Sequence, residues 1–118
     1  MQLQTFAMNL TSEQPVRLFE FYRDVVGLKV WPEMGGHALQ LGDATLFVDG
    51  HSETSGKTRE PQRVLIDFFV EDLKAEQSRL EAGGVEFVRR EGKEYWGGII
   101  STFLDPDGNY CQLIEYKP

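Results

Sequence analysis

The stretch TFLDPDGNYCQLIEY, residues 102–116, decides how the C-terminal part of the chain folds. Apolar and aromatic residues on both sides of Asp105-Pro106-Asp107-Gly108 read as two strands. Proline fixes φ, the aspartate side chains cap the turn locally, and glycine supplies a residue with positive φ. The stretch therefore predicts a β-hairpin, with strands at about residues 98–104 and 109–116.

Working outward from this hairpin, the same order of elements is found twice. The first half predicts a strand at 3–10, a helix that starts near Thr11 and Ser12 and ends at Gly27, and strands at 28–34, 37–41 and 44–49. The second half predicts a strand at 64–70, a helix at 72–82, a strand at 85–89 and then the hairpin. Because a polar stretch at 50–62 separates the halves, we interpret the chain as an internal repeat joined by a loop.

The composition limits the kind of protein. A chain of 118 residues with 41% apolar residues is long enough for one domain with a core. A net charge of −7 argues against partners such as nucleic acid or an anionic membrane, which require clustered Lys and Arg. No stretch is long enough to span a bilayer and no signal peptide is visible, so a cytoplasmic location is expected. The single cysteine, Cys111, is expected to pack as a small apolar residue.

Several short motifs carry a family resemblance. They are LFEFYRDVVGL at 18–28, VEDL at 70–73, LEAGGV at 80–85, WGG at 96–98 and the terminal hairpin. In this order they resemble the vicinal oxygen chelate superfamily, which includes glyoxalases, bleomycin resistance proteins and ring-opening dioxygenases. The resemblance implies an α+β fold in a single domain, residues 1–118, made of two βαβββ modules whose sheets curl into a shared cup. Module one would span about 3–49, the loop 50–62 and module two about 63–117.

The resemblance also implies a homodimer, and a small-molecule ligand held on the inner faces of the sheets. In metal-dependent relatives the cup holds a divalent ion through His, Glu or Gln side chains, whose oxygens and imidazole nitrogens suit such ions. The matching positions here are Thr5, Phe47, Leu65 and Gln112, of which only Gln112 could bind a metal. We therefore expect no metal and no cofactor. A rearranged metal site that uses His37, Asp67 or His51 stays open.

Strand alternation indicates what the inner face offers instead. It places Phe47 with Asp49, Asp67 with Phe69, and Tyr110 with Gln112, while Trp96 joins them from the family resemblance. Aromatic walls with one or two carboxylates suit flat or cationic organic ligands, through stacking and cation–π attraction. In the alternative interpretation these aromatic side chains only fill one another's space.

Three functions are compatible with these residues. The first is a metal-free binding protein that holds a small aromatic or cationic compound without altering it. The second is a lyase, isomerase or dioxygenase of the same superfamily with a rearranged metal site. The third is an enzyme without metal that uses Asp67 or His37 as general base. The sequence does not identify the ligand, because a fold does not fix a function.

Overall fold

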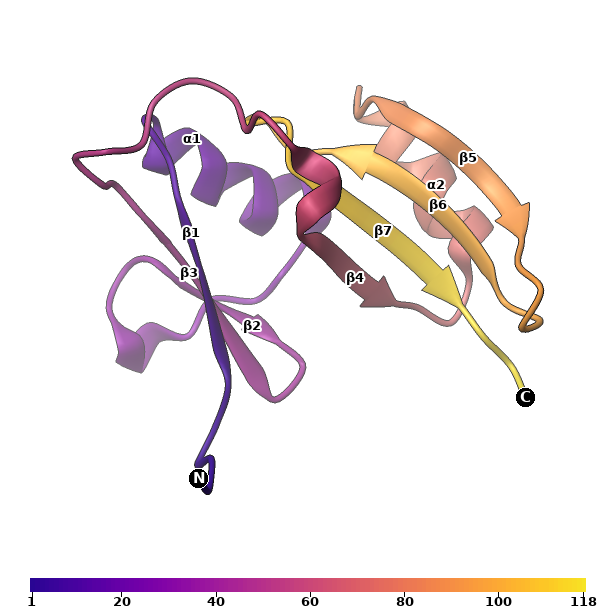
Figure 1. The fold of residues 1–118 in the computed structure, drawn as a ribbon, viewed down its shortest axis with the longest axis horizontal. Helices are drawn as coiled ribbons and strands as arrows, with labels where there is room; N and C mark the ends of the chain where they lie inside the picture. The colour runs from indigo at the N-terminus through magenta and orange to yellow at the C-terminus, as the bar shows by residue number, and fades with distance from the viewer. The chain divides into compact units, whose positions relative to one another are not determined.

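The structure, a computed structural model, describes residues 1–118. The chain divides into two compact units, Met1–Gly56 and Lys57–Pro118, and the division falls within the polar stretch that was predicted to be a loop. Each unit has its own sheet and its own main helix (Figure 1). The α+β architecture with two strand-helix-strand modules is confirmed, whereas the curling of both sheets into a shared cup stays a prediction.

The first unit contains a sheet of three strands in the order β1-β3-β2. The strands are β1 (Ala7–Thr11), β2 (Ala38–Leu41) and β3 (Ala44–Asp49), and β1 runs parallel to β3. Helix α1 (Pro15–Glu20) continues into a π-helical turn, Phe21–Val26, that ends at Gly27 as predicted, with φ of 92°. Leu18 and Tyr22 from the helical segment are fully buried, so this face of the helix forms the core of the unit.

Two predicted strands of this unit differ from the structure. The first strand begins at Ala7 rather than at residue 3, and the predicted strand at 28–34 is reduced to an isolated bridge between Val30 and Leu39. Pro32 starts a short 3₁₀ turn, Pro32–Met34. Since proline has no backbone N–H to donate to a neighbouring strand, it stops the ladder there.

The second unit contains a sheet of four strands in the order β4-β7-β6-β5. The strands are β4 (Leu65–Phe69), β5 (Phe87–Lys93), β6 (Ile99–Leu104) and β7 (Tyr110–Glu115); a 3₁₀ turn, Pro61–Arg63, precedes β4, and helix α2 (Leu73–Ala82) follows it. Strand β4 runs parallel to β7, as β1 runs parallel to β3 in the first unit. The two units therefore share the same order of elements, except that the strand predicted at 28–34 is only an isolated bridge in the first unit.

Local sequence explains where α2 begins and ends. The Asp72 side chain accepts a hydrogen bond from the Ala75 backbone N–H at 3.1 Å, which caps the helix N-terminus. Gly84, with φ of 89°, reverses the chain after the last turn. The core beneath α2 contains Phe103, which is fully buried between the rings of Phe68 and Phe87.

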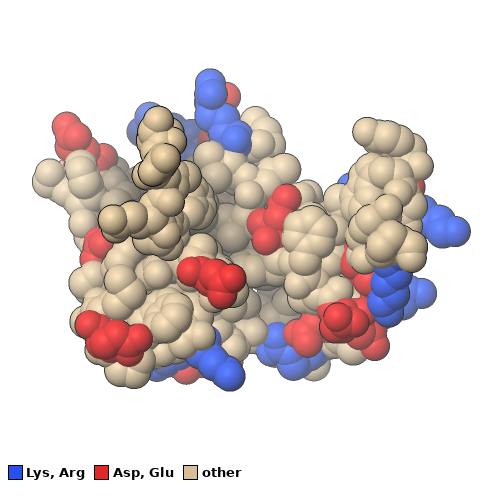
Figure 2. Space-filling model, turned by 90° about the horizontal axis from the view of Figure 1, so that it is seen from below, with Lys and Arg blue, Asp and Glu red and all other residues tan.

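The surface agrees with the acidic composition. On the face shown in Figure 2, acidic and basic side chains are interspersed among uncharged ones.

None of the helices is long and apolar enough to cross a membrane. Cys111 is buried in β7, as predicted.

Candidate ligand-binding face of the second unit

Strand β4 separates its side chains into a buried set and an exposed set. Ile66 is only 5% exposed, and the Phe68 ring stacks on Phe103 with centroids 6.4 Å apart. Leu65, Asp67 and Phe69 alternate with these residues and are exposed, Phe69 to 72%. Because neighbouring side chains of a strand point to opposite faces, Asp67 and Phe69 point away from the core. This confirms the alternation predicted for this strand.

Asp67 has a polar neighbour on the adjacent strand. It lies opposite Gln112 in the parallel pairing of β4 and β7, so the two side chains share one face. The Gln112 Nε2 donates a hydrogen bond to Thr102 Oγ1 at 3.1 Å. This bond uses an amide N–H, so the amide Oε1 remains available as an acceptor on the face that Gln112 shares with Asp67. The pair therefore offers two hydrogen-bond acceptors to a donor that approaches the sheet.

Apolar and aromatic side chains continue along the same face. Tyr110 lies opposite Leu65, and Ile114 lies opposite Phe69. Because side chains two residues apart in a strand are separated by about 7 Å, the Phe69 ring is one such step from the Asp67 carboxylate. The face thus combines an acidic position, Asp67, with the exposed ring of Phe69, whereas Ile114 is buried.

Trp96 lies in the turn between β5 and β6. A Cβ atom at Gly98 would clash with the Trp96 ring, so the indole covers the Gly98 backbone. The Trp96 ring also meets Tyr116 edge to face, with centroids 5.4 Å apart. Tyr116 follows Gln112 by four residues, about 13 Å along an extended chain. The sequence analysis did not name Tyr116 as a candidate, and Tyr116 lies just after the end of β7.

The chemistry of Asp67 follows from its surroundings. No hydrogen-bond or ion-pair partner of its carboxyl is found within the second unit, and partial burial raises the pKa of this group above its usual range. Desolvation disfavours the charged form, and no nearby cation compensates for it. An ionised carboxylate that lacks a partner is available to a cationic or hydrogen-bonding ligand.

The raised pKa predicts how stability depends on pH. A carboxyl whose pKa is higher in the folded than in the unfolded state destabilises the fold wherever it is ionised, and this penalty disappears below its unfolded pKa of about 3.9. We therefore expect Asp67→Asn to raise the free energy of unfolding at pH 7 and to leave it unchanged near pH 3. Urea unfolding of both proteins at the two pH values tests this. A variant less stable than the parent at pH 7 would contradict it.

The other predicted residues lie in the first unit. Phe47 alternates with the buried Leu46 and Val48 of β3, and its ring lies 5.6 Å from that of His37. The His37 Nε2 lies 3.6 Å from Asp49 Oδ1. His51 accepts a hydrogen bond from the Glu53 backbone N–H and is exposed. Roles for Phe47 and His37 in the same ligand site as Asp67 stay predictions.

The positions that correspond to metal ligands do not fit a divalent ion. Thr5 precedes β1, and Phe47 and Leu65 carry no donor atom. Nowhere in the chain do three or more His, Cys, Asp or Glu side chains gather in a way that could hold a metal ion.

Comparisons with known proteins agree with this topology. The sequence model of the Glyoxalase/Bleomycin resistance protein/Dioxygenase superfamily matches residues 7–113. Among curated protein sequences, none matches the chain.

Solved structures of the same fold are similar over nearly the whole chain. A glyoxalase/bleomycin resistance protein/dioxygenase family enzyme from Burkholderia phytofirmans has a TM-score of 0.75 at 19% identity, with 92% of this chain and 95% of that chain covered. A superfamily member from Sphaerobacter thermophilus has a TM-score of 0.70 at 17% identity, with 98% and 99% covered. An integron cassette protein from Vibrio cholerae has a TM-score of 0.70 at 20% identity, with 99% and 98% covered.

Proposed function

The chain belongs to the glyoxalase/bleomycin resistance protein/dioxygenase superfamily, and from this premise we propose that it binds a small aromatic cation without altering it. The ligand would lie on the exposed face of the second sheet. Its positively charged group would contact Asp67 and Gln112, and its ring would lie against Phe69. Pairing of two copies and a cytoplasmic location belong to the same proposal.

One observation supports the proposal: the Asp67 carboxylate is partly desolvated and lacks a partner within its unit. It shares a face with the Gln112 amide, whose oxygen is also a hydrogen-bond acceptor. Two adjacent acceptors favour a donor such as an amidinium or ammonium group over an anion. The exposed Phe69 ring adds apolar surface and a π face for the rest of the molecule. An uncharged or anionic ligand would leave the carboxylate without compensation.

A titration with benzamidinium, a flat aromatic cation, tests this function. We expect saturable shifts of the Asp67, Phe69 and Gln112 backbone amides in NMR spectra. We expect Asp67→Asn to weaken binding about tenfold or more, the usual loss for a hydrogen bond between charged groups. The neutral isostere benzamide is expected to bind weakly to the parent protein.

The matched control is Asp43→Asn, which removes an exposed carboxylate in the turn between β2 and β3. Its affinity for benzamidinium should equal that of the parent protein. Equal affinity of Asp67→Asn and Asp43→Asn, or stronger binding of benzoate than of benzamidinium, would contradict the proposed function.

A further inference from the structure

The first unit contains a cavity that the proposed function does not use. It has a volume of about 390 Å³ and lies between the α1 segment and the end of β3. Cavities of roughly 300–1,000 Å³ are typical of small-molecule sites. All of its lining residues belong to the first unit, so this cavity is distinct from the exposed face that carries Asp67.

The helical wall of the cavity is apolar. Pro15, Val16 and Phe19 line it from α1, and Val48 lines it from β3. Val16 is 69% exposed, so its side chain is accessible to a ligand in the cavity. Gly36 and Gly50 complete the lining without side chains, and no atom lies within 4 Å of a Cβ built at Gly36. The cavity therefore has apolar surface and open space for the body of a ligand.

The only lysine or arginine that lines the cavity is already paired. Arg23 donates hydrogen bonds from Nε and Nη2 to the two carboxylate oxygens of Asp24, at 2.7 and 2.8 Å. These bonds lower the pKa of Asp24 and keep it ionised, so that the pair is neutral. The Arg23 guanidinium also lies 5.5 Å from the centre of the Phe19 ring. The cation is thus compensated on one side and stacked on the other, which leaves it little attraction for an anionic ligand.

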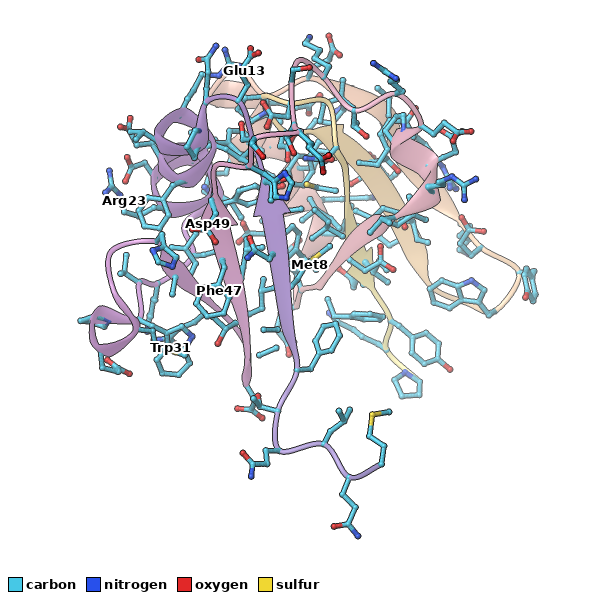
Figure 3. All side chains as sticks on the ribbon, turned by 60° about the vertical axis from the view of Figure 1, so that its left-hand side comes forward. Met8, Glu13, Arg23, Trp31, Phe47 and Asp49 are labelled. Atoms are coloured by element: carbon cyan, nitrogen blue, oxygen red, sulfur yellow. The ribbon has the colours of Figure 1, made fainter.

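The acidic side chains of the cavity are less well compensated. Glu20 forms no hydrogen bond, although its negative charge contributes to raising the pKa of Arg23. Asp49 Oδ1 lies 3.6 Å from His37 Nε2, which is longer than a normal hydrogen bond. Figure 3 shows Arg23 and Asp49 on the α1 side of the first unit, with Phe47 next to Asp49 on β3. With Arg23 neutralised by Asp24, the remaining formal charges at the cavity are negative.

We propose that this cavity is a second ligand site, which takes a small organic ammonium ion with an apolar body. The ammonium group would contact Glu20 and Asp49, and the apolar part would pack against Pro15, Val16 and Phe19. The His37 imidazole, half exposed beside Asp49, supplies a further polar contact for the ligand.

The test uses 2-phenylethylammonium as the probe and 3-phenylpropionate as an anion of nearly the same shape. In NMR titrations of the full chain, the ammonium ion should cause saturable shifts of the Gly36 and Gly50 amides. The propionate should not. Asp49→Asn, which keeps the shape of the side chain, should weaken this binding about tenfold or more. Gly36→Leu should weaken it, because a side chain at this position of the lining would occupy space that the ligand needs.

Two controls separate this site from other acidic positions. Asp43→Asn and Asp67→Asn should both leave the dissociation constant measured at Gly50 unchanged, since neither carboxylate lines the cavity. The proposal is overturned if the Gly36 and Gly50 amides do not shift in a saturable way. It is also overturned if the propionate shifts them equally, or if Asp49→Asn binds the ammonium ion as tightly as the parent protein. Preserved peak dispersion in the variants shows that they are folded.

Discussion

Phe103→Ala is expected to lower the free energy of unfolding by about 3–5 kcal/mol, the usual cost of truncating a buried phenylalanine. Phe103 is fully buried in β6. Its ring stacks on Phe68 at 6.4 Å and meets Phe87 at 5.5 Å between centroids. Truncation would remove the middle ring of three and leave a cavity that the two outer rings, held on different strands, cannot easily fill. Urea unfolding followed by circular dichroism measures the loss.

Phe69→Ala is the matched control, because it makes the same chemical change on the opposite face of the same sheet. Phe69 is 72% exposed, so little apolar surface would return to water when its ring is removed. We expect a loss below about 1 kcal/mol, together with weaker binding of benzamidinium. Similar losses for Phe69→Ala and Phe103→Ala would mean that the assignment of the two faces of the sheet is wrong.

The faces of the second sheet could be predicted because its strands alternate regularly between strong turn signals. The Asp-Pro-Asp-Gly turn fixes where β6 ends and β7 begins, and a period of two then determines the face of every side chain. Asp67 and Gln112 were therefore placed on one face from the sequence, and the pairing of β4 with β7 confirms it. The hydrogen bond between Gln112 and Thr102 could not be predicted from the sequence. Alternation indicates on which face a side chain lies, but not which residue it contacts.

The first strand could not be delimited in the same way. Leu3 begins the predicted strand and Phe6 shares the face of Met8 and Leu10, yet Leu3 is 71% exposed and Phe6 is 65% exposed. The ladder begins at Ala7 opposite Thr45, because β3 itself begins only at Ala44. A strand ends where its partner ends, and alternation within one segment carries no information about the length of another.

The cavity of the first unit was missed for a related reason. Its lining comes from a helix, from a loop before β2 and from the end of β3, which are separated by up to 35 positions between Pro15 and Gly50. No periodic pattern joins such positions. The pairing of Arg23 with Asp24 also looks, in the sequence, like an ordinary solvated pair on a helix surface. Only the structure shows that this pair lies at the edge of a cavity that also contains the carboxylates of Glu20 and Asp49.

Asp105→Ala is expected to lower the free energy of unfolding by about 3 kcal/mol, because the side chain holds the terminal turn together. Asp105 is 4% exposed. Its Oδ1 accepts hydrogen bonds from the backbone N–H groups of Asp107 and Asn109, both at 2.9 Å, and its Oδ2 accepts one from Asn109 Nδ2 at 2.8 Å. Alanine would leave these donors without their acceptor. Urea unfolding of the variant and the parent protein measures the effect.

Asp107→Ala provides the control within the same turn. Its backbone carbonyl accepts a hydrogen bond from the Thr58 N–H at 2.9 Å, and the substitution keeps this bond. The Asp107 side chain makes no hydrogen bond or ion pair, so we expect a loss below about 0.5 kcal/mol. A large loss in Asp107→Ala and a small one in Asp105→Ala would show that charge or composition at the turn matters more than the three hydrogen bonds. The expected result is a larger loss of stability in Asp105→Ala than in Asp107→Ala. It would mean that the Asp105 carboxylate fixes the register of β6 against β7, and therefore the face on which Gln112 lies with Asp67.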